Sequence, residues 1–273
     1  MAEANRISLN TATVSRQWSL AQCVEGCLRH GFGGISPWRD KLHEAGVAEG
    51  ARLIRNSGLG VSGLCRGGWY TAEGALTPAV LDDNRRAVDE AAAIGAACLV
   101  MVVGGLPKGS RDIDGAREIV TEGLAHTLEY AREAGVPIAL EPLHPMYAGD
   151  RACVNTTGQA LDICDQLGEG IGLALDVYHV WWDPEVKRQI ARAGRERLLA
   201  FHICDWLVPT RDLVLDRGMM GDGVIDIDGL RAAVEAEGFD GLLEVEIFSD
   251  ANWWNRDPDE VLSTIAQRVA ALA

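Results

Sequence analysis

The sequence predicts a (β/α)8 barrel, the TIM-barrel architecture, from three observations. Short apolar segments recur, helical segments separate them, and glycines stand between most helices and the next strand. The chain has 273 residues, close to the ~250 residues typical of this architecture. The apolar segments do not alternate with polar residues, as expected for parallel strands covered on both faces. No linker, low-complexity tract or charge block interrupts the pattern, so we expect a single barrel domain over residues 1–273.

Eight predicted strands follow one another along the chain: Ile7–Leu9, Gly34–Ile35, Gly60–Leu64, Cys98–Val103, Pro137–Leu140, Gly172–Leu175, Leu198–Phe201 and Leu242–Val245. Helical periodicity between them is clearest in four segments, Leu20–Arg29, Ala79–Ile94, Ile113–Ala134 and Val261–Leu272. Three sequences are typical of capping boxes at helix starts: Ser19-x-x-Gln22, Thr156-x-x-Gln159 and Asp257-x-x-Glu260. Glycines that allow a left-handed helix end precede the next strand at Gly31, Gly58, Gly95, Gly135, Gly168 and Gly238.

An open, doubly wound sheet is the alternative fold. That fold would carry a glycine-rich phosphate-binding turn after an early strand. The candidate turn, Gly104-Gly105-Leu106-Pro107, lacks the required spacing, and Pro107 would disturb the start of a helix. The sequence therefore favours the closed barrel.

Composition restricts the partners and the compartment. The net charge of −15 disfavours binding to nucleic acid or to an anionic membrane surface. The chain contains no apolar run of membrane-spanning length and no visible signal peptide. Its seven scattered cysteines include no CxxC pair, which is typical of buried thiols in a reducing compartment. We therefore expect a cytoplasmic protein.

Four of the later predicted strands run directly into a residue that can bind a metal: Glu141, Asp176, His202 and Glu246. Chemistry in a barrel sits where strands end and the following loops begin, so these side chains should converge. Three carboxylates and an imidazole at one point would repel each other unless a divalent cation lay between them. Oxygen ligands with one nitrogen favour Mn²⁺ or Mg²⁺, with Co²⁺ as an alternative.

Further polar residues accompany these four. His144 and His179 each follow a predicted ligand by three positions, and Arg217 lies in the long loop after His202. His144 is expected either to support a ligand or to contact the substrate. Glu244 shares a sheet face with Glu246 and should point deeper into the barrel, where the sequence names no partner for it.

These residues and their spacing resemble the xylose isomerase-like TIM-barrel sugar isomerases and epimerases, which include ketose 3-epimerases, hydroxypyruvate isomerase and inosose dehydratases. The resemblance rests on the motifs Glu141-Pro142, Asp176-Val-Tyr-His179, Phe201-His202-Ile-Cys-Asp205, Arg217-Gly218 and Glu244-Val-Glu246. It implies that Glu141, Asp176, His202 and Glu246 bind the metal. It also implies that Glu141 and Glu246 form the acid/base pair, and that His179 and Arg217 contact the substrate.

The substrate stays open at this point. The run Leu-His-Pro-Met-Tyr after Pro142 departs from the polar run usual in the epimerases and is closer to a branch that resembles enzymes acting on 3-keto-glycosides. No cluster of basic residues suited to a phosphate is visible, because Arg39, Arg66 and Arg217 are isolated in the sequence.

The expected activity is a metal-dependent isomerisation or epimerisation of a keto-sugar or sugar derivative, through a metal-stabilised enediolate. A lyase or hydratase acting on a keto-glycoside or keto-cyclitol through the same enediolate is the alternative. An endonuclease of related fold is disfavoured by the acidic composition, and a simple binding protein would not need two acid/base carboxylates. The expected partner is a small-molecule carbohydrate, and the oligomeric state stays open, with a homo-oligomer as one alternative.

The tryptophans form an unusual feature of the composition. The chain has eight Trp but only four Phe, and in the predicted barrel all eight follow strands, on the side of the predicted metal ligands. We expect some to line the substrate site, where an aromatic ring can stack on a sugar. The candidates are Trp38, Trp69 and Trp182. The alternative is that they pack the loops together.

Overall fold

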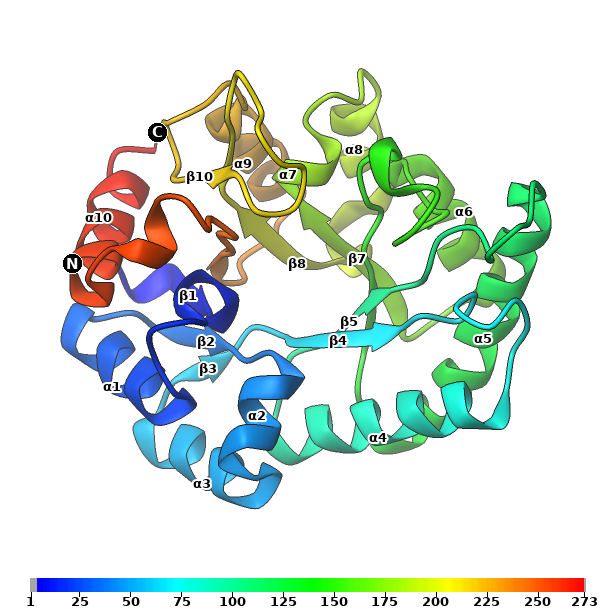
Figure 1. Ribbon diagram of the computed structural model, residues 1–273, viewed down its shortest axis with the longest axis horizontal. Helices are drawn as coiled ribbons and strands as arrows, with labels where there is room; N and C mark the ends of the chain where they lie inside the picture. The colour runs from blue at the N-terminus through cyan, green and yellow to red at the C-terminus, as the bar shows by residue number, and fades with distance from the viewer. Residues whose placement is uncertain (1–3, 273) are drawn as a thin grey trace.

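The computed structural model describes residues 4–272 and confirms the predicted architecture, with helices arranged around a central barrel of parallel strands (Figure 1). The barrel strands are β1 (Ile7–Asn10), β2 (Gly34–Ser36), β3 (Gly60–Val61), β4 (Leu64–Gly68), β5 (Leu99–Val102), β6 (Ile138–Leu140), β7 (Ile171–Asp176), β8 (Leu198–Ile203) and β11 (Leu243–Val245). Each predicted strand therefore corresponds to a strand of the barrel.

The third predicted strand closes the barrel. In the sheet order β3-β2-β1-β11-β8-β7-β6-β5-β4, the two end strands are consecutive in sequence, separated only by Ser62 and Gly63. One part of this extended segment pairs with β2 and the other with β5. The first and last strands are direct neighbours, with Ile7 opposite Leu243.

The helices are α1 (Leu20–His30), α2 (Arg39–Ala45), α3 (Val47–Ser57), α4 (Pro78–Ile94), α5 (Ile113–Ala134), α6 (Thr157–Leu167), α7 (Val177–Val180), α8 (Val186–Arg197), α9 (Ile227–Ala236) and α10 (Pro258–Val269). The predicted capping boxes at Ser19 and Thr156 are present. At the third position, the Asp257 side chain caps α10 by accepting from the N–H groups of Asp259 and Glu260, without the reciprocal bond of a capping box. None of the helices in the described part of the chain is long and apolar enough to cross a membrane.

Short elements complete the loops that surround the predicted site. These are the 3-10 helices η1 (Ala4–Arg6), η2 (Thr11–Val14), η3 (Pro145–Tyr147) and η4 (Trp253–Asn255), and the antiparallel pair β9 (Asp205–Trp206) and β10 (Arg217–Gly218). The pair β9–β10 lies in the long loop after β8 and positions Arg217.

The strands pack differently on their two faces. Large side chains such as Leu99 and Met101 belong to the main core, together with residues of the helices. Alternate positions of the later strands form a separate cluster of small side chains: Cys65, Cys98, Val100, Ala139, Ala174 and Ala200. Because side chains of a strand alternate between faces, this cluster shares the inner face with the predicted metal ligands. All seven cysteines are free and buried, as expected.

A close approach between α5 and the loop after β4 fixes that loop. Tyr70 is fully buried, and its hydroxyl lies 2.7 Å from that of Thr127 on α5. A Cβ atom on Gly123 would lie 2.4 Å from the Tyr70 ring. We therefore expect Gly123→Ala to lower the free energy of unfolding by about 1–2 kcal/mol, since overpacking outweighs the ~1 kcal/mol that alanine contributes to a helix.

Urea denaturation measures this effect. Gly158→Ala on α6 is the matched control, because its added methyl group would meet Gln189 only at an ordinary contact distance. Equal stability changes in the two variants would contradict the packing explanation.

Candidate metal centre

Four consecutive barrel strands, β6, β7, β8 and β11, bring the predicted ligands to one point. Asp176 is the last residue of β7 and His202 lies within β8. Glu141 directly follows β6, and Glu246 directly follows β11. One ligand atom from each of these four buried side chains lies within 4.8 Å of every other. The convergence expected from the strand ends is therefore present.

The chemistry of these side chains fits a divalent cation. Oε1 of Glu141 and both ring nitrogens of His202 are buried and have no hydrogen-bond partner among the described residues. The atoms Glu141 Oε1 and His202 Nδ1 nevertheless lie only 3.3 Å apart. Buried polar atoms are normally satisfied, because an unsatisfied one costs about 1–3 kcal/mol. A cation bound between them would satisfy both.

Arg217 and His179 border the ligands. Nη1 of Arg217 donates hydrogen bonds to Asp176 Oδ2 at 2.8 Å and to Glu246 Oε2 at 3.0 Å. Its Nη2 lies 3.2 Å from His179 Nε2. The guanidinium also lies over the Tyr178 ring, 4.5 Å from its centroid. The carboxylates of Asp176 and Glu246 thus compensate the charge of Arg217, and these hydrogen bonds restrict the orientation of both carboxylates.

Burial and neighbouring charges shift the pKa values of the carboxyl groups in different directions. Burial raises the pKa of Glu141, and it raises that of Glu246 to about 7. Burial acts in the same direction on Asp176, but Arg217 and nearby histidines prevail and lower its pKa. The carboxyl groups therefore differ in proton affinity although they share one site.

The two histidines are also perturbed in opposite directions. Burial lowers the pKa of His179 to about 3, so this ring is neutral. Burial also acts to lower the pKa of His202, but the surrounding glutamates prevail and raise it to about 10. The surroundings of His202 thus favour positive charge, and metal binding would release its proton.

The partners of Glu244, which sequence reasoning could not name, lie on the inner face of the barrel. Asn10 Nδ2 donates to Glu244 Oε1 at 2.7 Å and to Glu246 Oε1 at 2.9 Å. Ser62 donates to the other Glu244 oxygen at 2.7 Å. Asn10 therefore orients two carboxylates at once. Asn10 is the last residue of β1, and the four predicted ligands likewise stand where their predicted strands end. This position in the sequence could have identified Asn10 as a site residue.

Replacing Asn10 removes the donor that Glu244 and Glu246 share. We expect Asn10→Ala to lower the free energy of unfolding by about 1–3 kcal/mol, because two buried acceptors lose a partner. We also expect kcat to fall by a larger factor than KM changes, because Glu246 loses a hydrogen bond that fixes its orientation. Chemical denaturation and steady-state kinetics measure the two effects. Asn56→Ala, on the exposed surface of α3, should change neither.

A cavity of about 80 Å³ adjoins the candidate metal centre. Its wall includes five predicted site residues, Glu141, Glu246, His179, Arg217 and Trp38. Trp38 Nε1 also donates to Glu246 Oε1 at 3.3 Å. The wall further includes residues that sequence reasoning did not select, notably Arg66, Tyr147, Arg151 and Phe248. Asp176 and His202 do not line it, so of the four ligands the two glutamates face the cavity.

The remaining predicted substrate contacts lie outside this cavity wall. Trp69 borders an adjoining groove of about 430 Å³, which shares Trp38 and Arg66 with the cavity. Trp182 donates its indole N–H to the His179 carbonyl at 2.8 Å. The His144 ring stacks on Trp206, with centroids 5.0 Å apart. His144 and Trp182 therefore support the loop around His179 instead of facing the cavity.

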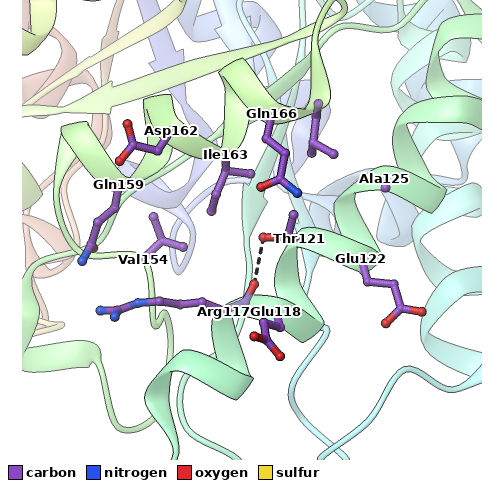
Figure 2. Close-up of a pocket in the computed structure, with 11 residues that line it drawn as sticks. Arg117, Glu118, Thr121, Glu122, Ala125, Val154, Gln159, Asp162, Ile163 and Gln166 are labelled. Carbon is purple, nitrogen blue, oxygen red and sulfur yellow. Dashed lines mark hydrogen bonds between the residues drawn. The ribbon is translucent and has the colours of Figure 1, made fainter.

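Figure 2 shows a separate groove on the outer helical layer, between α5 and α6. It has a volume of about 530 Å³, and its wall includes Arg117, Thr121, Gln159 and Asp162. The Thr121 hydroxyl donates to the Arg117 carbonyl within α5. None of the predicted ligands lines this groove, so its volume does not bear on the metal chemistry.

Comparison with known proteins identifies the family. The family described as xylose isomerase-like TIM barrel matches residues 24–268. An inosose isomerase of Bacillus velezensis is 28% identical over 159 residues, covering 55% of this chain and 53% of that protein. The matched region thus spans about half the length of this curated relative.

Two solved structures show the same fold over nearly the whole chain. A protein of Sinorhizobium meliloti 1021 is 56% identical, with 99% of both chains covered and a TM-score of 0.95. The IolI protein, whose structure contains a bound zinc atom, is 19% identical, covers 98% of this chain and 97% of its own, and has a TM-score of 0.80. The chain therefore belongs to the xylose isomerase-like TIM-barrel family.

Proposed function

We propose that this chain is a divalent-metal-dependent isomerase or epimerase of a keto-sugar or sugar derivative. The observation that carries the proposal is the orientation of the four clustered side chains. Glu141 and Glu246 line the cavity, whereas Asp176 and His202, which belong to the same cluster, do not. Two carboxylates can therefore reach a substrate that is bound beside the metal. The inosose isomerase relative supports this class of reaction.

Glu141, Asp176, His202 and Glu246 would hold the metal. When bound, a divalent cation would polarise a carbonyl and its neighbouring hydroxyl and make the adjacent C–H more acidic. Three carboxylates with one imidazole suit Mn²⁺ or Mg²⁺, with Co²⁺ as an alternative. The zinc in the IolI structure shows that a member of this fold binds a divalent ion.

The glutamates would move the proton. Glu246 is suited to general base catalysis, because it is a carboxylate on the wall of the cavity beside the candidate metal centre. Asn10 and Trp38 donate to its Oε1, and Arg217 donates to its Oε2, so the carboxylate is held in one orientation. Glu141 has an oxygen without a hydrogen-bond partner. In its protonated form, Glu141 would donate its own proton to the substrate while Glu246 keeps the proton that it removed, and exchange of both groups with solvent would restore the starting state.

Other residues on the cavity wall would hold the hydroxyl groups of the substrate by hydrogen bonds. His179 is neutral and next to Arg217, so the pair can bind a hydroxyl group without competing for the proton that the glutamates transfer. Trp38, Phe248 and Tyr147 supply apolar surface around the reacting carbon and exclude water from it. We propose a small-molecule carbohydrate as the substrate on these grounds.

A panel of keto-sugars incubated in D₂O with metal-loaded protein tests the proposal by NMR. The expected result is deuterium on the carbon next to the carbonyl, with formation of the isomer or epimer. A new vinylic signal would instead indicate elimination by a lyase that removes the same proton. Absence of deuterium from every neutral and acidic keto-sugar, with the metal present, would contradict the proposal.

A further inference from the structure

Arg66 lies on the wall of the same cavity without a charged partner. Its guanidinium carbon lies 4.5 Å from the centroid of the Trp69 ring and 6.0 Å from that of Trp38. Within residues 4–272 it makes no hydrogen bond and no ion pair. Arg39, at the neighbouring groove, instead binds both Asp83 and Glu90. A half-buried guanidinium with only aromatic contacts has unused donors.

The backbone places Arg66 in this position through an irregularity of the barrel. In the pairing of β4 with β5, Cys65 is opposite Val100 and Gly67 is opposite Met101, so Arg66 has no partner residue. Such a bulge redirects side chains, and bulges are common beside active sites. As a result, consecutive residues of β4, Cys65 and Arg66, both line the cavity.

Arg151 supplies a second guanidinium to the cavity wall from the loop after β6. Its backbone is fixed, because its N–H donates to the Tyr147 carbonyl and its own carbonyl accepts from Gly104. Its Nε is buried and has no hydrogen-bond partner in the described chain. Among residues 4–272, the only carboxylate within ion-pair distance of Arg151 is that of Asp150, 3.8 Å away, which is too far for a hydrogen bond.

Neither guanidinium donates a hydrogen bond to a carboxylate within residues 4–272, and the one ion pair between them is the 3.8 Å contact of Arg151 with Asp150. The pKa of Arg66 is lowered, mainly by burial; the charges of Arg151 and Arg39 act in the same direction and outweigh, together with burial, the opposing effects of Cys65 and Glu141. Neither Arg66 nor Arg151 forms an ion pair with Glu141 or Glu246, the carboxylates on the cavity wall. Because the chain has 40 acidic residues against 25 basic ones, this lack of pairing is unusual. An anionic ligand would supply the missing countercharge.

We propose that Arg66 and Arg151 form a subsite for an anionic group of the substrate, either a carboxylate or a phosphate monoester. The substrate would then be an acidic sugar derivative, with its carbonyl at the metal and its anion at the two arginines. This inference rests on the proposed function, because it takes the metal centre as the place of reaction. It also corrects the expectation that Arg66 is isolated, since the fold brings Arg151 to the same cavity.

Calorimetric titration of metal-loaded protein with three matched probes tests the subsite. The probes are D-fructose, D-fructuronate and D-fructose 6-phosphate, which are respectively neutral, carboxylated and phosphorylated. We expect at least one acidic probe to bind about tenfold more tightly than D-fructose, since charge-assisted hydrogen bonds are being added. The acid with the larger advantage identifies the anionic group.

Arg66→Met and Arg151→Met should remove this advantage and leave the Kd of D-fructose unchanged. Arg66→Lys should keep part of it, because the positive charge remains. Arg52→Met is the control, since Arg52 is exposed and pairs with Glu49, and it should retain the full advantage. Thermal unfolding of each variant confirms that it is folded, and Arg66→Lys provides the comparison if Arg66→Met is not.

Three results would overturn the subsite. These are equal affinity of the wild type for all three probes, an acid advantage that survives in both Met variants, and an equal loss of affinity for D-fructose and the acids. The last would indicate that Arg66 only packs against the tryptophans. A different result would contradict the proposed function alone. In that case the acidic probes bind more tightly than D-fructose and lose this advantage in the Met variants, but no keto-sugar takes up deuterium.

Discussion

Removal of the divalent metal is expected to abolish turnover and to lower the thermal midpoint of unfolding by roughly 10 °C. The physical reason is the concentration of buried charge at one point, where Glu141, Asp176 and Glu246 meet His202. A ligand present at 1,000 times its Kd stabilises the folded state by about 4 kcal/mol. Scanning calorimetry of EDTA-treated and metal-loaded protein, with metal content measured on both samples, gives the difference.

Restoration by added metal is the control for this experiment. Mn²⁺ should recover both the activity and the thermal midpoint of the stripped wild type. It should have much less effect on Asp176→Asn combined with His202→Asn, because two of the four ligands are then missing or weakened. Full activity in protein that holds no divalent ion would contradict the metal-dependent mechanism.

Glu246→Gln is expected to reduce solvent exchange into the substrate by a factor on the order of 10² to 10⁴, the usual contribution of a general acid or base. An amide cannot accept the proton, yet it is similar in size to the carboxylate and keeps an oxygen toward the metal. The rate of deuterium incorporation, followed by NMR on samples of measured metal content, gives the effect.

Two comparisons make the Glu246 result specific. Glu49→Gln replaces an exposed glutamate of α3 that pairs with Arg52, and it should exchange at the wild-type rate. Glu141→Gln should also be impaired, because the proposed mechanism uses both cavity-facing carboxylates. Wild-type exchange in a Glu246→Gln protein that holds its metal would show that another group removes the proton.

Most of the barrel could be predicted because strand and helix signals agree along the chain. The third strand is the exception, since the predicted segment Gly60–Leu64 extends in the structure through β4 to Gly68. The sequence pattern ends early because a charged residue and two glycines follow, which are poor strand formers. Pairing with β5 compensates for this weak propensity, and such pairing is a long-range effect.

The cluster of Glu141, Asp176, His202 and Glu246 could be predicted for a similar reason, because each of these residues stands at the end of a strand that the sequence indicates. Asn10 obeys the same rule but was not selected, because an amide is a weaker sign of a metal site than a carboxylate. Arg66 and Arg151 lie far apart in sequence, and only the closed barrel brings them to one cavity. His144 and Trp182 are close in sequence to site residues, yet neither lines the cavity, since His144 stacks on Trp206 and Trp182 donates to the His179 carbonyl.

The central claim, that four side chains hold one divalent cation, is tested most directly by diffraction from crystals soaked in Mn²⁺ and measured at the manganese absorption edge. The account predicts one strong anomalous peak for each chain, coordinated by Glu141, Asp176, His202 and Glu246. Two results would contradict the account. One is well-ordered density for these four side chains with no anomalous peak between them, and the other is a single anomalous peak elsewhere in the molecule.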